Sequence, residues 1–210
     1  MKAQTNKLIP SYLFVAIMLA IPWSFAAGDD LNPPPYRGDP LSVHAHWSTG
    51  TSGQFGLMNF SWVDDNDPST QLYPSEPFYL FDPASGGYDF QIPNFIDELP
   101  LKLLRLQLTW EGTTQPPVSI VALGQDLGQV VPGIVTYYSS PLVFTQPDGG
   151  YQYFDIEFRP NPDFEMLHIE LAPDAQLAQV VIDSVSTIPE PATMGLLGIG
   201  AMTLLIRRKR

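Results

Sequence analysis

Leu104-Arg105-Leu106-Gln107-Leu108-Thr109-Trp110 places an apolar side chain at every second position. The same alternation runs through Phe154-Asp155-Ile156-Glu157-Phe158 and through Leu167-His168-Ile169-Glu170-Leu171. Successive side chains of a β-strand point to opposite faces, so a period of two turns one face inward and the other toward water. These three stretches therefore predict amphipathic β-strands.

Further short apolar runs, separated by Gly, Pro, Asp and Asn, continue this pattern between residues 41 and 188. They are Leu41–Trp47, Phe55–Val63, Phe78–Phe81, Tyr88–Ile92, Val118–Leu123, Val130–Tyr138 and Gln179–Thr187. Turns are expected at Gly86-Gly87, Asp148-Gly149-Gly150 and Pro160–Asp163. Many short strands between regular turns are typical of a sandwich or barrel. We expect an all-β ectodomain over residues 41–188, an antiparallel β-sandwich that resembles the jelly-roll domains which often bind carbohydrate.

The charge of the chain is strongly acidic, with 10 Lys and Arg against 22 Asp and Glu among its 210 residues. Between Ala27 and Ile188, four basic residues face 21 acidic ones, which gives this region a formal charge of about −17. A domain of this charge is not expected to bind nucleic acid. The chain has no cysteine, so it has neither disulfides nor a thiol nucleophile.

The first residues have the pattern of an export signal. Lys2 and Lys7 precede the apolar run Leu13–Ile21, and Ser24-Phe25-Ala26 supplies small residues where a signal peptidase reads the chain. We expect residues 1–26 to be a signal peptide cleaved after Ala26, with an uncleaved anchor as the alternative. Residues 27–40, which include three consecutive prolines, are interpreted as a Pro-rich linker.

The last residues combine a rigid turn, an apolar stretch and a basic cluster. Pro189-Glu190-Pro191 is followed by Ala192–Ile206, which has no charge, and then by Arg207, Arg208, Lys209 and Arg210. As a helix the apolar stretch would be roughly 23 Å long, somewhat shorter than the hydrocarbon layer of a membrane. We expect a single transmembrane helix that is followed by a cytoplasmic stop-transfer cluster. The alternative is a buried C-terminal helix of a soluble domain.

This order of features resembles the PEP-CTERM sorting signal, over about a tenth of the chain. The resemblance rests on Pro189, Glu190 and Pro191, on the apolar segment, and on Arg207–Arg210. It implies recognition and processing at the Pro-Glu-Pro motif by an exosortase, a membrane-embedded protease or transpeptidase. It also implies a Gram-negative bacterium that makes extracellular polysaccharide. The protein would then be exported, anchored in the membrane by its C-terminus, and passed to the cell surface or the extracellular matrix.

Two groups of side chains in the predicted domain suggest metal binding. Asp64, Asp65, Asn66 and Asp67 follow a predicted strand and offer the oxygen ligands that calcium takes, although the spacing of a known calcium loop is absent. A solvated turn explains the same residues. His44 and His46 lie on one face of their predicted strand and could begin a transition-metal site, for which His168 is the one further histidine.

Two further groups suggest contact with sugars. Tyr151 and Tyr153 are expected to be partly exposed and to stack on sugar rings, with a second layer of the sandwich as the alternative. Asp155 and Glu157 share a strand face at about 7 Å, a separation that would suit glycoside hydrolysis. The exposed side of an amphipathic strand explains the same pair.

The hypothesis that follows is a non-enzymatic exported protein of the cell surface or matrix, with an ectodomain that binds glycan or calcium and needs no other cofactor. The alternatives are a secreted hydrolase that acts on a polysaccharide and a domain that is only a matrix spacer.

Overall fold

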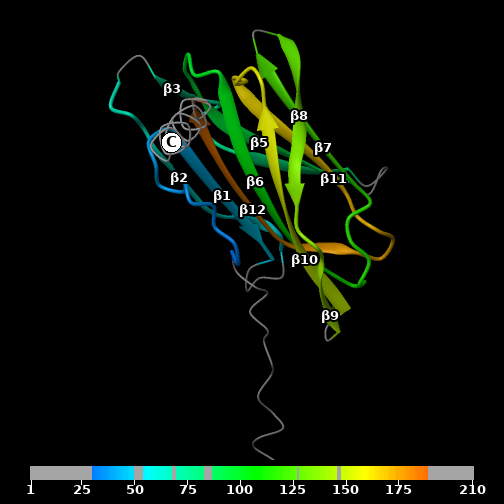
Figure 1. Ribbon diagram of the computed structural model, residues 1–210. Helices are drawn as coiled ribbons and strands as arrows, with labels where there is room; N and C mark the ends of the chain where they lie inside the picture. Colours follow the sequence, from blue (N-terminus) through cyan, green and yellow to red (C-terminus); the bar gives the residue numbers. More distant parts are fainter. Residues whose placement is uncertain are drawn as a thin grey trace, which may run out of the picture.

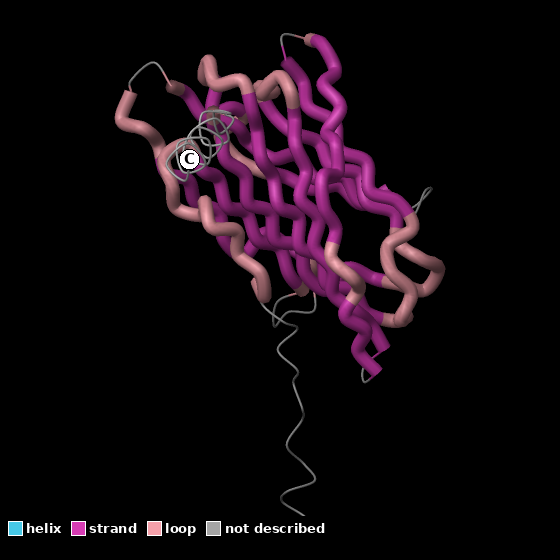
Figure 2. Tube along the Cα trace, viewed as in Figure 1, coloured by secondary structure: helices cyan, strands magenta, loops and turns pink. Residues whose placement is uncertain are grey.

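The computed structural model describes residues 30–49, 54–67, 70–82, 87–126, 128–145 and 148–188. These residues form twelve β-strands and no helix (Figures 1 and 2). The strands are β1 (Ser42–Ser48), β2 (Gly56–Val63), β3 (Gln71–Tyr73), β4 (Phe78–Asp82), β5 (Gly87–Ile96), β6 (Leu101–Glu111), β7 (Ser119–Asp126), β8 (Gln129–Tyr138), β9 (Leu142–Thr145), β10 (Asp148–Phe158), β11 (Phe164–Glu170) and β12 (Gln176–Thr187).

The strands form one hydrogen-bonded path in the order β2-β1-β12-β6-β10-β8-β7-β11-β5-β3, with β4 paired to β5 and β9 paired to β10. Each of these pairs is antiparallel. The path curls, so that β5 and β11 lie across from β1, β12 and β6 (Figure 1). The all-β antiparallel prediction is confirmed, whereas two separate sheets of a sandwich are not, because one continuous path joins the described strands.

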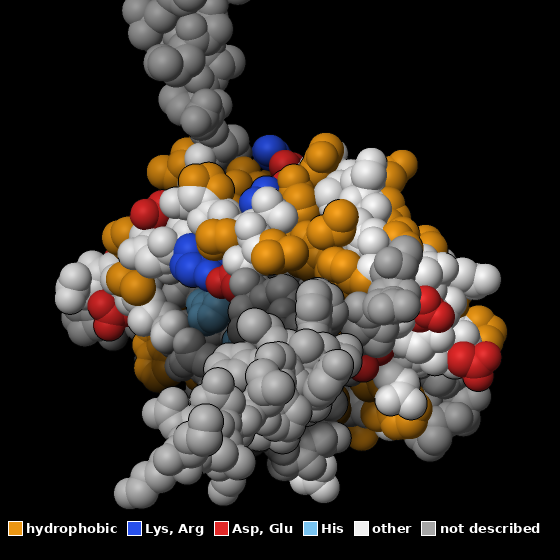
Figure 3. Space-filling model, turned by 90° about the horizontal axis from the view of Figure 1, so that it is seen from below, with side chains coloured by type: hydrophobic (Ala, Val, Ile, Leu, Met, Phe, Trp, Pro, Cys, Tyr) orange, Lys and Arg blue, Asp and Glu red, His pale blue; other side chains and the backbone are white. Residues whose placement is uncertain are grey.

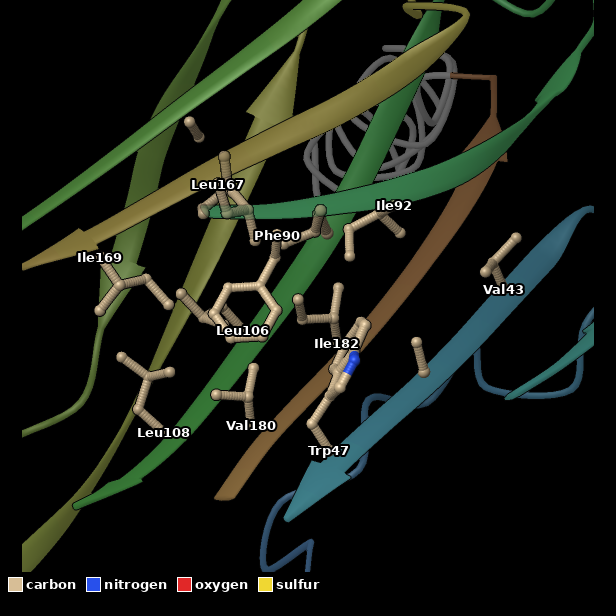
Figure 4. Close-up of a cluster of buried hydrophobic side chains, with 14 of the residues drawn as sticks. Val43, Trp47, Phe90, Ile92, Leu106, Leu108, Leu167, Ile169, Val180 and Ile182 are labelled. Carbon is tan, nitrogen blue, oxygen red and sulfur yellow. The ribbon is translucent and has the colours of Figure 1, made fainter. Parts of the chain in front are cut away.

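The hydrophobic core fills the space inside this curl. Phe90 of β5 meets Trp47 of β1 edge to face, with 5.0 Å between the ring centroids. Leu167 of β11 and Ile182 of β12 project into the same space from opposite sides (Figure 4). Large side chains with almost no exposed surface come from both sides of the curl, as native packing density requires.

The structure contains all ten strands that the alternation predicts, with shifted bounds, together with β3 and β9, which are too short to show a period. The turn expected at Asp148-Gly149-Gly150 is wrong, because β10 begins at Asp148. Gly150 lies against the indole of Trp110, and a Cβ at that position would stand 2.4 Å from a ring carbon. These glycines therefore make room for a core tryptophan instead of bending the chain.

Both targeting segments predicted from the sequence, the signal peptide and the transmembrane helix, lie outside the described residues. Within the described ranges, no helix has the length and apolar character that crossing a bilayer would require.

Candidate functional site

The outer face of β1, β12, β6 and β10 carries a continuous patch of polar side chains. Its central row runs across the strands in register, from His44 through Asp183 and Arg105 to Asp155. Because directly opposed residues of paired strands share a face, this row gathers charges that are far apart in the sequence. We call this surface the polar face.

Much of the polar face is buried, which corrects the expectation that the polar positions of these strands point into water. Gln107, Thr109 and Asp183 are each at most 3% exposed. Residues 30–40, which we interpreted as a linker, lie along this face; we call them the strap. The backbone N–H of Asn32 donates to Gln107 Oε1 at 2.9 Å, and Gln107 Nε2 donates to Asp30 Oδ1 at 2.7 Å.

Arg37 is the main link between the strap and the sheet. Its guanidinium binds Asp183 through Nε, at 2.6 Å from Oδ1, and through Nη2. The same side chain forms a two-point contact with Asp30. Fork-shaped pairing of this kind satisfies both carboxylates and fixes their geometry.

This pairing shifts the pKa values of the groups that take part. Burial would raise the pKa of Asp30, but hydrogen bonds from Arg37 and Gln107 hold it below its ordinary value. Burial would lower the pKa of Arg37, but its bonds to Asp30 and Asp183 raise it. Tyr36, also in the strap, has a raised pKa because of burial and the nearby carboxylates of Asp183 and Asp155. The strap therefore carries a charged network in which each ion has a partner.

The structure separates the two tyrosines predicted to stack on sugars. Tyr151 is 4% exposed, so its expected partial exposure is wrong. It lies beneath the strap, where its hydroxyl donates to Gln107 Oε1 at 2.8 Å and accepts from Asn32 Nδ2 at 3.1 Å. Tyr153 is partly exposed, with the Arg105 guanidinium 4.6 Å from its ring centroid and the ring of exposed Tyr137 at 5.6 Å. Tyr153 and Tyr137 form an accessible aromatic pair.

The carboxylates considered for glycoside hydrolysis are both paired with arginines. Asp155 accepts from Arg105 Nε at 2.6 Å and from Nη2 at 2.8 Å, and Glu157 accepts from Arg159 Nε. Each carboxylate is thus already engaged by a guanidinium within the protein. This geometry gives no support to catalysis by the pair.

The acidic run after β2 forms a solvent-exposed loop with local hydrogen bonds. Asp64 Oδ1 accepts from the N–H of Asn66 at 3.2 Å, and Asp65 Oδ1 accepts from the N–H of Asp67 at 3.0 Å. Asn66 has a φ of 61°, a left-handed conformation that asparagine tolerates in turns. The geometry is that of a turn, and calcium binding by these four residues stays a prediction.

The histidines lie where the alternation places them, but they do not converge. His44 and His46 share the outer face of β1, where His44 Nδ1 lies 2.9 Å from Asp183 Oδ1. His168 of β11 lies on the other side of the curl and contacts Asp89 at 2.7 Å, a contact that raises its pKa. In the described part of the chain, no three His, Asp or Glu side chains gather closely enough to hold a metal ion.

The sequence interpretation did not find a second charged cluster, which lies at one end of the core. Lys102 and Glu165 are fully buried, with 3.9 Å between Nζ and Oε1. Lys102 also donates to Asn94 Oδ1, whereas neither oxygen of Glu165 accepts a hydrogen bond from another described residue. Burial raises the pKa of Glu165 to about 7 despite the opposing effect of Lys102, and burial lowers the pKa of Lys102. Both side chains point to the same face of their strands as the buried leucines. The alternation in the sequence could therefore have shown that they are buried.

The exposed surface agrees with the acidic composition. Seen from below, orange hydrophobic side chains cover much of the coloured surface, red acidic ones appear at scattered points, and blue basic ones are fewer (Figure 3).

The comparisons with known proteins identify the tail and leave the domain unmatched. Residues 187–210 match the family model of the PEP-CTERM protein-sorting motif, as the resemblance from the sequence predicts. No curated protein and no solved structure matches the chain. The match begins at Thr187, the last residue of β12. The chain therefore carries a PEP-CTERM protein-sorting motif that begins at the end of the last described strand of an all-β domain.

Proposed function

We propose that the protein is exported, anchored in the membrane by its C-terminal segment, and processed there by an exosortase. The observation that carries this proposal is the PEP-CTERM motif at residues 187–210. The end of β12 at Thr187 supports it, because the motif then follows the folded domain without an intervening described element. Pro189, Glu190 and Pro191 are the residues that the exosortase would recognise.

After processing, the domain would reside at the surface or in the extracellular matrix of a Gram-negative bacterium. We assign it a non-enzymatic role in contact with extracellular polysaccharide. The accessible Tyr153–Tyr137 pair supports glycan contact, since aromatic faces stack on sugar rings. The arginine pairing of Asp155 and Glu157 favours this role over hydrolysis.

Cell fractionation tests the sorting proposal. The full chain is expressed in an exosortase-positive bacterium and in the same strain without its exosortase. We expect the domain at the surface or in the medium of the first strain, and retained in the membrane of the second. Equal distribution in the two strains would contradict processing by an exosortase.

A further inference from the structure

A groove of about 480 Å³ opens on the outer face between the strap and the two strands at the end of the sheet path. His44 and His46 of β1 and Asn59 and Ser61 of β2 line its floor. Arg37 of the strap lines it as well. We call this cavity the β1–β2 groove. Its volume lies within the range of roughly 300–1,000 Å³ that small-molecule sites occupy.

The four floor side chains are arranged as two cross-strand pairs, His44 opposite Ser61 and His46 opposite Asn59. Neighbouring residues hold the two imidazoles. His44 Nδ1 contacts Asp183 Oδ1 at 2.9 Å, and His46 Nε2 lies 3.0 Å from Gln179 Nε2. The four side chains therefore stand on two hydrogen-bonded strands, and neighbouring residues hold both imidazole rings in place. Because these groups are already ordered, the entropic cost of binding a ligand is lower.

The groups that line the groove indicate the chemistry of its ligand. Amide, hydroxyl and imidazole groups donate and accept hydrogen bonds, as the hydroxyl groups of a sugar do. Arg37 is already paired with the carboxylates of Asp30 and Asp183, so it offers little net positive charge to an anion. These features favour a neutral, hydroxyl-rich ligand.

We propose that the β1–β2 groove binds a short stretch of a neutral polysaccharide. This inference rests on the proposed function, contact with extracellular glycan. It assigns the principal contact to β1 and β2, on the opposite side of the strap from Tyr153. The residues of β2 that determine binding are then Asn59 and Ser61, opposite His46 and His44.

Native affinity electrophoresis of the purified exported protein tests this assignment. The gels contain dextran, galactomannan or xyloglucan as neutral probes, and alginate as the acidic probe. We expect a neutral probe to retard the wild-type protein. Asn59→Ala/Ser61→Ala should weaken that binding by about tenfold, because two hydrogen bonds are removed. Thr136→Ala, an exposed hydroxyl deletion on β8, is the control that keeps wild-type retardation.

The outcomes separate the groove from the broader function. If Asn59→Ala/Ser61→Ala is retarded as strongly as the wild type but Tyr153→Ala is not retarded, the groove is not the binding site. Glycan contact by the protein would still be supported. Retardation by alginate alone would overturn the neutral ligand. Migration unaffected by every probe would overturn both the groove and the glycan contact. Circular dichroism and urea unfolding of each variant show whether the fold is kept. If the double variant unfolds, Asn59→Asp replaces it, because this substitution keeps the side-chain size and adds a charge.

Discussion

The domain between Asp30 and Ile188 is held by contacts between residues that are far apart in sequence, whereas the tail after it is defined by the order of its residues. Arg37 and Asp183, which fix the strap to β12, are 146 positions apart. The sorting motif needs only the consecutive residues 187–210, and these are the part that a family model recognises. Stability and sorting are therefore expected to respond to different substitutions, and variants in each region test this separation.

The largest expected effect is on sorting. Replacing Pro189, Glu190 and Pro191 together by alanine should abolish C-terminal processing in an exosortase-positive strain, because the recognition sequence is removed. The urea unfolding midpoint of the domain should stay at its wild-type value. A processed triple variant, or a domain with a clearly lowered midpoint, would contradict the separation of the two regions.

Arg37→Ala should have the converse effect. It leaves the Asp183 carboxylate, 1% exposed, without its guanidinium partner, and removing one partner of a buried ion pair costs about 3 kcal/mol of unfolding free energy. The fraction of chains that keep the fold should still be processed at the tail. Chemical denaturation measures the loss of stability.

Arg159→Ala is the matched control for Arg37→Ala. Arg159 pairs with Glu157 but is 54% exposed, so its loss should change the unfolding free energy by no more than about 0.5 kcal/mol. Equal effects of the two substitutions would show that the strap contributes no more than a surface ion pair.

The buried Glu165 should give the domain a pH dependence that the tail does not share. Its pKa is about 7 in the folded protein against an ordinary 4.5, so the native state keeps a proton that the unfolded chain has released. The stabilisation that Glu165 contributes to the native state is fully present below pH 4.5 and is lost as the pH rises through 7. Stability should therefore fall by about 1 kcal/mol per pH unit across this window.

Glu165→Gln, which cannot ionise, isolates this contribution. Urea titrations between pH 4.5 and 7 should show a flatter profile for the variant than for the wild type. An unchanged slope, or a wild-type stability that rises across the window, would rule out Glu165 as its source.

The smallest expected effect concerns the tyrosine that the strap covers. Tyr151→Phe removes the hydroxyl that joins Gln107 and Asn32, and should cost about 1 kcal/mol of unfolding free energy. Tyr138→Phe, at a 67% exposed position, should cost nothing measurable. If both variants unfold at the wild-type midpoint, the strap does not hold Tyr151 in solution.

The sequence predicted the strands well because a period of two is a local signal. Leu104, Leu106 and Leu108 alternate with polar residues, and all three are buried in β6. It could not predict that Gln107 is also buried, because the strap that covers it comes from a distant part of the chain. Gly149 and Gly150 were interpreted as a turn for the same reason, since the tryptophan they accommodate belongs to another strand.

The candidate sites show the same limit. The sorting motif could be identified from Pro189 to Arg210 because its features are consecutive. The β1–β2 groove could not, because it combines side chains of β1, β2 and the strap, and only the register of these strands brings them together. His44 and His46 were recognised as sharing a face, but their neighbours Asn59 and Ser61 belong to another strand.

The intact mass of the mature protein from exosortase-positive cells tests the central claim most directly. A chain that begins at Ala27 and lacks Arg207–Arg210, together with a longer product in the exosortase-deficient strain, is the predicted result. A mass that still includes Arg210 in the exosortase-positive cells would contradict it.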